Sequence, residues 1–281
     1  LTLGCYIGII FLREMMNQKI RGAADLAIIS GATIIGTIPE VDEDPTDIED
    51  AERAVSAEQQ SIIAESYRQA WTALSRSLQQ KGFSSLLVTS GMPGSGATTV
   101  VTNFADAASG AGLSVAVVDA NFRRPRLASI YGIEDDTPGL GDVLNGAREA
   151  LDVVQQVEGT SISGVSAGTP GNRIYDRFSD RSFDEFMATL RGSYGLVIID
   201  TAPAVAAGDA FILADRVDAT CMVIQANREE RGLVSRLINQ FNAARCELLG
   251  VVLNRPRRTA GGYFKKNYEL MASYTSEDPD D

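Results

Sequence analysis

Residues 85–99 form the stretch SLLVTSGMPGSGATT, and this stretch decides the fold. Its first six residues are a short apolar-rich run, typical of a strand that is covered on both faces. The residues from Gly91 to Thr98 then follow the pattern G-x-x-x-x-G-K-[ST], in which a glycine-rich loop joins a strand to a helix and cradles phosphate groups. Every fixed position matches except one, because Ala97 stands where the pattern has lysine. The stretch therefore predicts a strand, a phosphate loop without its cation, and a helix.

The parts of such a loop contribute separately to nucleotide binding. Glycines let backbone N–H groups converge on phosphate oxygens, and the N-terminus of the following helix adds a partial positive charge. The hydroxyl of Thr98 can bind Mg²⁺, whereas the missing lysine would place a point charge on the β- and γ-phosphates. The expected nucleotide-binding residues of the loop are Gly94, Ser95, Gly96, Ala97, Thr98 and Thr99. We expect weakened nucleotide binding and poor phosphoryl transfer; an ordinary glycine-rich turn is the alternative.

Strands and helices alternate on the C-terminal side of this loop. The further strands are expected at 114–119, 196–200, 220–225 and 248–253, and helices at 98–110, 179–192, 207–215 and 230–244. Such alternation predicts an α/β fold with a doubly wound, mainly parallel sheet flanked by helices. In this architecture ligands bind beyond the carboxyl ends of the strands. The chemistry is therefore expected just after residues 90, 119, 200 and 253.

Two of the predicted strands end on an acid. Asp119 closes the segment VAVVD, and Asp200 closes the segment LVIID, which is typical of a Walker B strand. A carboxylate there can hold Mg²⁺ or its water shell, and Asp119 can also accept the proton of an attacking hydroxyl. The predicted magnesium ligands are Thr98, Asp119 and Asp200, and Asp119 is the candidate catalytic residue. Either aspartate alone is explained as a cap of a loop or a helix. The glycine-rich loop, Asp119 and Asp200 together favour a nucleotide site.

The flanks of this core have a different composition. Residues 1–12 are uncharged and mostly apolar, and basic residues follow them, which is typical of the end of a truncated transmembrane helix whose following chain faces the cytoplasm. A buried core element is the alternative. The expected division begins with a membrane-helix end at 1–12, followed by a juxtamembrane segment at 13–39 that contains a helix at 13–30 and a short strand. An acidic linker at 40–56 leads to the core domain at 57–258, whose first helix is expected at 57–80. An acidic, tyrosine-containing tail follows at 259–281.

Composition excludes several kinds of site. The 281 residues contain no histidine, which removes Ser–His–Asp catalysis and histidine-bound zinc. The net charge of −12 comes from residues 40–52 and the last five residues, so the near-neutral body gives no support for nucleic-acid binding. Cys5, Cys221 and Cys246 are far apart and are expected to be buried and reduced.

Several segments together resemble the cytoplasmic domain of bacterial tyrosine kinases of the exopolysaccharide system, which are relatives of the MinD/ParA P-loop ATPases. Residues 119–127 (DANFRRPRL) resemble the Walker A′ segment of that family, and residues 138–146 (PGLGDVLNG) resemble a family-specific segment. Residues 200–203 and 208–210 resemble its Walker B region, and residues 249–254 its last core strand. The segment Gly36–Pro39 resembles the part that follows the second membrane helix of these proteins.

The resemblance implies roles that the residues alone do not give. It implies ATP or ADP with Mg²⁺ as cofactors, Asn254 near the adenine, and polysaccharide export or assembly membrane proteins (chain-length determinants, or co-polymerases) as partners. Arg255, after the last strand, is a further candidate for nucleotide contact or for contact with the membrane face. A homo-oligomer formed through the membrane part is implied, with Glu65 and Arg68 in an oligomer motif on one helix face. Tyr263, Tyr268 and Tyr274 are the candidate phosphoacceptors, and the location is the bacterial inner membrane with the domain in the cytoplasm.

Four departures from the family pattern bear on activity. Ala97 replaces the loop lysine, and Asn121 replaces the second aspartate of a D-x-D pair, so neither the charge nor a second base is present. Trp71 replaces the second arginine of the motif E-x-x-R-x-x-R, and the tail tyrosines are spaced instead of clustered. The leading hypothesis is a regulator of polysaccharide assembly with weak or absent kinase activity. The alternatives are an active ATP-dependent tyrosine autokinase that uses Arg123 or Arg124, a MinD/ParA-like ATPase, and an adaptor that binds no nucleotide.

Overall fold

The structure is a computed structural model, and it describes residues 18–134, 136–171, 174–257 and 270. Its centre is one sheet of eight strands in the order β1-β8-β7-β2-β6-β3-β5-β4. The strands are β1 (Ile34–Ile38), β2 (Ser85–Ser90), β3 (Val115–Asp119), β4 (Gln155–Gln156), β5 (Ile162–Val165), β6 (Leu196–Asp200), β7 (Ala219–Gln225) and β8 (Glu247–Asn254). All neighbouring pairs are parallel except β4 with β5. The predicted doubly wound, mainly parallel sheet is therefore confirmed.

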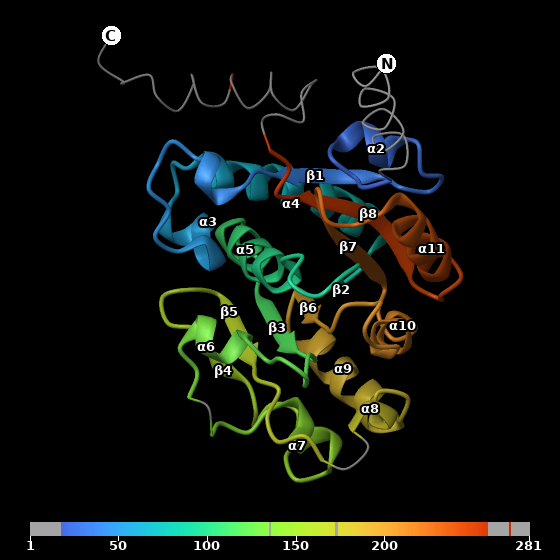
Figure 1. Ribbon diagram of the computed structural model, residues 1–281. Helices are drawn as coiled ribbons and strands as arrows, with labels where there is room; N and C mark the ends of the chain where they lie inside the picture. Colours follow the sequence, from blue (N-terminus) through green and yellow to red (C-terminus); the bar gives the residue numbers. More distant parts are fainter. Residues whose placement is uncertain (1–17, 135, 172–173, 258–269, 271–281) are drawn as a thin grey trace, which may run out of the picture.

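Helices cover both faces of the sheet (Figure 1). The helices are α2 (Ala23–Ala27), α3 (Ala54–Ala57), α4 (Ile62–Lys81), α5 (Ala97–Gly110), α6 (Leu127–Tyr131), α7 (Leu140–Leu144), α8 (Ile174–Arg177), α9 (Arg181–Ser193), α10 (Asp209–Ala214) and α11 (Arg231–Asn242). One core, between the sheet and α3–α6, takes side chains such as Leu86 and Ile198. A second core, between the sheet and α7–α11, takes the alternating neighbours Leu87 and Ile199. This alternation explains why the strands are apolar along their whole length.

Two expected helices have different bounds. The helix expected at 57–80 begins at Ile62, because Ser61 caps it by accepting a hydrogen bond at Oγ from the N–H of Ala64. The helix expected at 13–30 is wrong over its described part, since Lys19 forms an antiparallel bridge with Glu230 and only Ala23–Ala27 is helical. Pairing with the chain before α11 takes up the backbone groups that a helix would have used.

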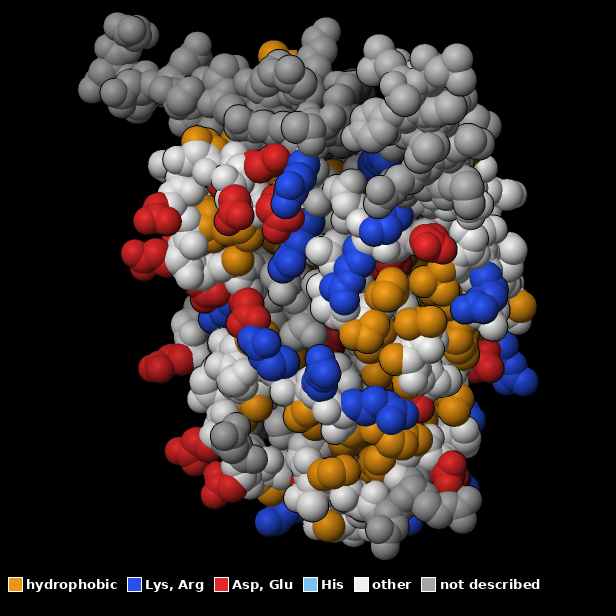
Figure 2. Space-filling model, in the orientation of Figure 1, with side chains coloured by type: hydrophobic (Ala, Val, Ile, Leu, Met, Phe, Trp, Pro, Cys, Tyr) orange, Lys and Arg blue, Asp and Glu red, His pale blue; other side chains and the backbone are white. Residues whose placement is uncertain are grey.

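The acidic segment 40–56 lies against the core. It contains two short 3-10 helices, Val41–Glu43 and Ala51–Arg53, followed by α3. Arg53 pairs with Asp106 of α5 at 2.6 Å, and Figure 2 shows acidic side chains on the side of the molecule where α3 lies. The expected division into linker and domain stays a prediction, but this segment is packed onto the helix that starts at the phosphate loop.

Among the described residues, no helix has the length and apolar character needed to cross a membrane. The expected membrane-helix end at residues 1–12 and Cys5 lie outside the described residues. Cys221 and Cys246 are buried and free, as expected.

Close packing of β1 on α4 gives a prediction for stability. A Cβ on Gly36 would collide with Ala70, so Gly36→Ala is expected to lower the free energy of unfolding by about 1–3 kcal/mol. Gly232, in the first turn of α11, has open space and is the control. Gly232→Ala is expected to raise the free energy of unfolding by about 0.5–1 kcal/mol. Urea unfolding of both variants measures the difference, and equal values would contradict the packing of β1 on α4.

Candidate nucleotide-binding site

The loop between β2 and α5 has the backbone of an anion cradle. Gly94 and Gly96 have φ of 80° and 95°, in the left-handed region that favours glycine. Gly96 caps α5 without any side-chain hydrogen bond. In the part of the chain that the structure describes, the amides of Gly96, Ala97 and Thr98 have no hydrogen-bond acceptor. N–H groups at a helix start point out of the helix, so this end of α5 fits the oxygens of a phosphate group.

Ala97 begins α5 and is 8% exposed, so the position of the missing lysine is a small, mostly buried methyl group. The proposed substitute Arg123 is engaged elsewhere. Its Nη2 lies 3.4 Å from Asp209 Oδ2, and its guanidinium stacks over the ring of Tyr175 at 4.3 Å. The described contact of Arg124 is a backbone one, its N–H donating to Asn121 Oδ1. Arg123 therefore does not replace the lysine in this arrangement.

Thr98 and Asp200 meet as the magnesium prediction requires. Thr98 Oγ1 donates to Asp200 Oδ2 at 2.7 Å, although 102 residues separate them. Asp200 is 1% exposed, and its Oδ1 has no hydrogen-bond partner. A buried carboxylate oxygen without a partner is costly, and a hard cation coordinated by oxygen would satisfy it. The donor set of one hydroxyl and one free carboxylate oxygen therefore fits Mg²⁺.

Asp119 lies beside Asp200, because the two residues are register partners on β3 and β6. Its carboxylate also closes the next loop, accepting from the N–H of Asn121 at 3.0 Å, of Arg126 at 2.8 Å and of Leu127 at 3.0 Å. A carboxylate has about four acceptor positions, so one remains for a metal-bound water or a substrate hydroxyl. Asn121 also accepts a hydrogen bond at Oδ1 from the N–H of Arg124, so its side-chain amide closes the same loop.

Burial raises the proton affinity of both aspartates. Burial raises the pKa of Asp200 well above its ordinary value, and the negative charge of Asp119 raises it further. Burial also raises the pKa of Asp119, against the hydrogen bonds from Leu127, Arg126 and Asn121 that lower it. Two neighbouring buried carboxylates repel each other, so a divalent cation between them would favour the ionised pair.

Asn254 and Arg255 have separate surroundings at the end of β8. Asn254 Nδ2 donates to the carbonyl oxygen of Ser95 at 2.8 Å and packs against Gly96, so it supports the phosphate loop. Arg255 donates its N–H to Ile38, and its Nε lies 3.8 Å from Glu40 Oε1. The structure thus brings Asn254 to the loop and holds the Arg255 side chain at the end of β1. The contact with adenine stays a prediction.

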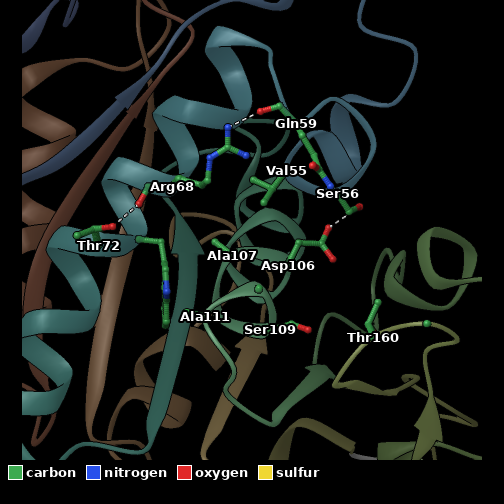
Figure 3. Close-up of a pocket in the computed structure, with 13 residues that line it drawn as sticks. Val55, Ser56, Gln59, Arg68, Thr72, Asp106, Ala107, Ser109, Ala111 and Thr160 are labelled. Atoms are coloured by element: carbon green, nitrogen blue, oxygen red, sulfur yellow. Dashed lines mark hydrogen bonds between the residues drawn. The ribbon is translucent and has the colours of Figure 1, made fainter.

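Arg68, one of the two expected oligomer residues, lines a hollow of about 570 Å³ between α3, α4 and α5 (Figure 3). Arg68 donates from Nε to Glu65 at 3.0 Å and from Nη2 to the carbonyl oxygen of Gln59, so the pair is formed within one chain. Trp71 is 5% exposed and packs on Phe104, which is a core role. Oligomer formation stays a prediction, and Tyr263, Tyr268 and Tyr274 lie outside the described residues.

Two site residues were missed by the sequence analysis. Arg228 Nη1 lies 3.1 Å from the point where a Cβ on Gly94 would stand, and Glu229 accepts a hydrogen bond from Ser95 Oγ at 2.6 Å. Both follow the end of β7, the strand next to β2. The rule that sites lie after parallel strands, applied also to residue 225, would have found them.

The position of Arg228 gives a prediction for nucleotide affinity. Arg228→Ala is expected to weaken binding of Mg·ATP by about threefold at low salt, because a cation beside Gly94 is lost while solvent screens part of its effect. Arg123→Ala is the matched control and is expected to change affinity little, since Arg123 pairs with Asp209. Calorimetric titration at two salt concentrations measures this. A larger loss for Arg123→Ala would contradict the assignment.

Known bacterial tyrosine-protein kinases are similar to this chain in sequence and in structure. No protein-family model matches the chain. The chain is 29% identical over 265 residues to a putative tyrosine-protein kinase EpsB of Ralstonia nicotianae, which covers 90% of this chain and 35% of that protein. The chain thus spans about a third of that relative's length. The crystal structure of the VpsO kinase domain is 30% identical with a TM-score of 0.63, and the match covers 67% of this chain and 94% of that domain.

More distant structures share the fold. The cell-division ATPase MinD of Pyrococcus furiosus has a TM-score of 0.56 at 21% identity, over 67% of this chain and 79% of that one. Cobyrinic acid a,c-diamide synthase of Mycobacterium smegmatis, with a bound ATP analogue and magnesium, has a TM-score of 0.55 at 17% identity, over 70% of this chain and 82% of that one. These likenesses confirm the predicted P-loop, MinD-like fold class.

Proposed function

Because this chain belongs to the family of bacterial tyrosine-kinase cytoplasmic domains, we propose that it is a nucleotide-binding, kinase-like domain whose phosphoryl transfer is weak or lost. Its role would be to regulate exopolysaccharide biosynthesis or export. Nucleotide occupancy, instead of turnover, would then change its conformation or contacts, which requires that the nucleotide bind two states with different affinity.

One observation carries the proposal: the cradle and the magnesium residues are assembled around a position that holds only a methyl group. The free amides of Gly96 and Thr98 and the pair of Thr98 with Asp200 support binding of a nucleotide with Mg²⁺. Ala97 supports weakened catalysis, because phosphoryl transfer depends on charge stabilisation at the transferred group. The nearest arginine, Arg228, is exposed and bonded to Gln225, so it is a poor replacement for a fixed lysine.

The membrane location and the polysaccharide partners belong to the same proposal. They are supported by the resemblance to the exopolysaccharide kinases and by the apolar residues 1–12 with basic residues after them. Fractionation of bacterial cells that make the full-length protein tests the location. Recovery with the inner membrane would support it, and recovery of the full-length protein in the soluble fraction would contradict it.

The nucleotide role is tested by titrating the purified domain with ATP and ADP, with and without Mg²⁺, and then assaying tyrosine autophosphorylation. We expect saturable binding that Mg²⁺ strengthens and little or no phosphotyrosine. Robust autophosphorylation would favour the active autokinase. Absence of binding, together with no thermal stabilisation by nucleotide, would favour the adaptor.

A further inference from the structure

Glu229 is a buried acid whose position needs an explanation. Its side chain is fully buried, in the loop between β7 and α11. Oε1 accepts hydrogen bonds from Ser95 Oγ at 2.6 Å and from the N–H of Gln225 at 3.1 Å, while Oε2 has no partner. A buried carboxylate beside an anion cradle that has lost its lysine is unfavourable for phosphate binding, since both groups carry negative charge.

The carboxyl group contacts the phosphate loop near both of its ends. At one end Ser95 donates to it, and at the other a Cβ on Gly91 would collide with Oε2. Gly91 has no left-handed φ, so the close approach of Glu229 explains the glycine at this position. The first fixed glycine of the loop pattern therefore makes room for this side chain.

The loop that carries Glu229 is joined to the segment 18–20 by backbone hydrogen bonds. The N–H of Ile20 donates to the carbonyl oxygen of Glu229 at 2.9 Å, and the N–H of Asn227 donates to that of Ile20 at 2.6 Å. The N–H of Arg231 also donates to Gln18 at 2.9 Å. These backbone hydrogen bonds hold the main chain on both sides of Glu229, and its side chain is thereby kept beside the phosphate loop.

The two hydrogen bonds of the Ser95 hydroxyl can form together only when Glu229 is neutral. Ser95 Oγ lies 2.9 Å from the carbonyl oxygen of Met92 and 2.6 Å from Glu229 Oε1, and a hydroxyl has one proton to donate. A protonated Glu229 would donate to Ser95, which would then donate to Met92. Burial raises the pKa of Glu229, the hydrogen bonds from Ser95 and Gln225 and the charge of Arg228 oppose this rise, and the resulting pKa is about 6. Arg228 is the charged group that acts on Glu229 from the described elements around it, whereas Ser95 and Gln225 contribute neutral donors.

We propose that Glu229 is the positioning residue of the phosphate loop: as the neutral acid it fixes Ser95 and the main chain at residues 91–92 in the shape that receives the phosphates. This inference rests on the proposed nucleotide function. When Glu229 is ionised, Ser95 donates to Glu229 and no longer to Met92, and a negative charge stands near the cradle. Nucleotide affinity therefore falls as the pH rises through about 6, because phosphate binding favours the protonated form.

Titration of the domain with Mg·ADP between pH 5.5 and 8 tests this, with Glu229→Ala, Glu229→Gln and the neighbour Glu230→Gln. We expect Glu229→Ala to weaken binding about tenfold, as expected for the loss of a buried hydrogen-bonding anchor of about 1.4 kcal/mol. Glu229→Gln is neutral and keeps an oxygen that can accept from Ser95 and Gln225, although it lacks the proton that Glu229 donates to Ser95. It is therefore expected to restore most of the binding and to show no decline in affinity between pH 5.5 and pH 8. Glu230→Gln, which changes an exposed carboxyl group, is expected to follow the wild type.

Wild-type affinity in Glu229→Ala, or a pH profile of Glu229→Gln parallel to that of the wild type, would overturn the proposal. If Glu229→Ala does not fold, the profile of Glu229→Gln decides. Hydrogen exchange of residues 91–96 without nucleotide separates this inference from the function. Faster exchange of these residues in Glu229→Ala than in Glu230→Gln would support the role of Glu229 as an anchor of the loop. This result would hold even if the wild type bound no nucleotide, and that absence of binding would overturn only the proposed function. Equal exchange would count against the anchor.

Discussion

Restoring lysine at position 97 is expected to raise affinity for Mg·ATP by about tenfold and any tyrosine autophosphorylation by about a hundredfold. Ala97 is the first residue of α5, directly after Gly96. A lysine side chain starting there would carry its ammonium group to phosphates held by the amides of the loop. The affinity is measured by calorimetry and the activity by phosphotyrosine detection on the same preparations.

A matched variant separates charge from side-chain length at this position. Ala97→Met has a chain of similar length without the ammonium group and is expected to show no gain. An equal gain in both variants would mean that packing, and not charge, limits the site. No gain in Ala97→Lys would mean that another cation already serves the phosphates, and Arg228 is the first to examine because it lies beside Gly94.

Asp200→Asn is expected to change nucleotide binding and stability in opposite directions. Binding should lose its dependence on Mg²⁺ and weaken at least about tenfold in its presence, because the free carboxylate oxygen disappears. Without ligands, the variant should be more stable at pH 8 by about 1–3 kcal/mol, since a buried charge beside Asp119 is removed. The amide oxygen can still accept the hydrogen bond from Thr98.

The sign of the stability change follows from the pKa shift. The pKa of Asp200 is raised in the folded protein, so the folded state binds the proton more tightly than the unfolded chain does. Wild-type stability is therefore lost as the pH rises from about 4 through the raised pKa, and Asp200→Asn removes its part of that loss.

Asp218 gives the opposite control. Burial raises its pKa, but hydrogen bonds from Ser84 and Ser85 and the charge of Arg191 lower it overall. It lies before the first residue of β7, at the other end of the sheet from the site. Asp218→Asn should therefore lower stability at neutral pH, and the difference from wild type should shrink as the pH falls below about 4. Thermal unfolding from about pH 2.5 to about pH 8 measures both variants on the two sides of the ordinary aspartate pKa. A loss of stability in Asp200→Asn at pH 8 would contradict the buried carboxylate pair.

The sequence predicted the part of the fold that apolar runs encode. β2, β3, β6, β7 and β8 were expected within a residue or two, because a strand covered on both faces needs a continuous run of apolar side chains. β4 and β5 were missed, as were α6, α7 and α8. β4 has two residues, β5 includes a serine and a glycine, and the helices have four or five residues each. Elements this short show no periodicity.

Part of the candidate site could also be predicted from the sequence, and part could not. Thr98, Asp119 and Asp200 could be grouped in advance, because parallel strands deliver their carboxyl ends to one edge of the sheet. The same rule, applied to the end of β7, would have placed Glu229 near the loop, but it could not have given the hydrogen bond with Ser95, since that side-chain contact spans 134 residues and no local pattern specifies it. The sequence also could not show whether Arg123 takes the place of the lysine, because this depends on the direction of its side chain. The contacts with Asp209 and Tyr175 determine that direction.

The central claim is that backbone amides at the start of α5 hold a nucleotide's phosphates without a loop lysine. Amide NMR spectra of the ¹⁵N-labelled domain, recorded while Mg·ADP is added, test it most directly. The account predicts large, saturable shifts at Gly94, Gly96, Ala97 and Thr98, with no comparable shift at Gly232 in α11. Unchanged signals for these loop amides at saturating Mg·ADP would contradict it.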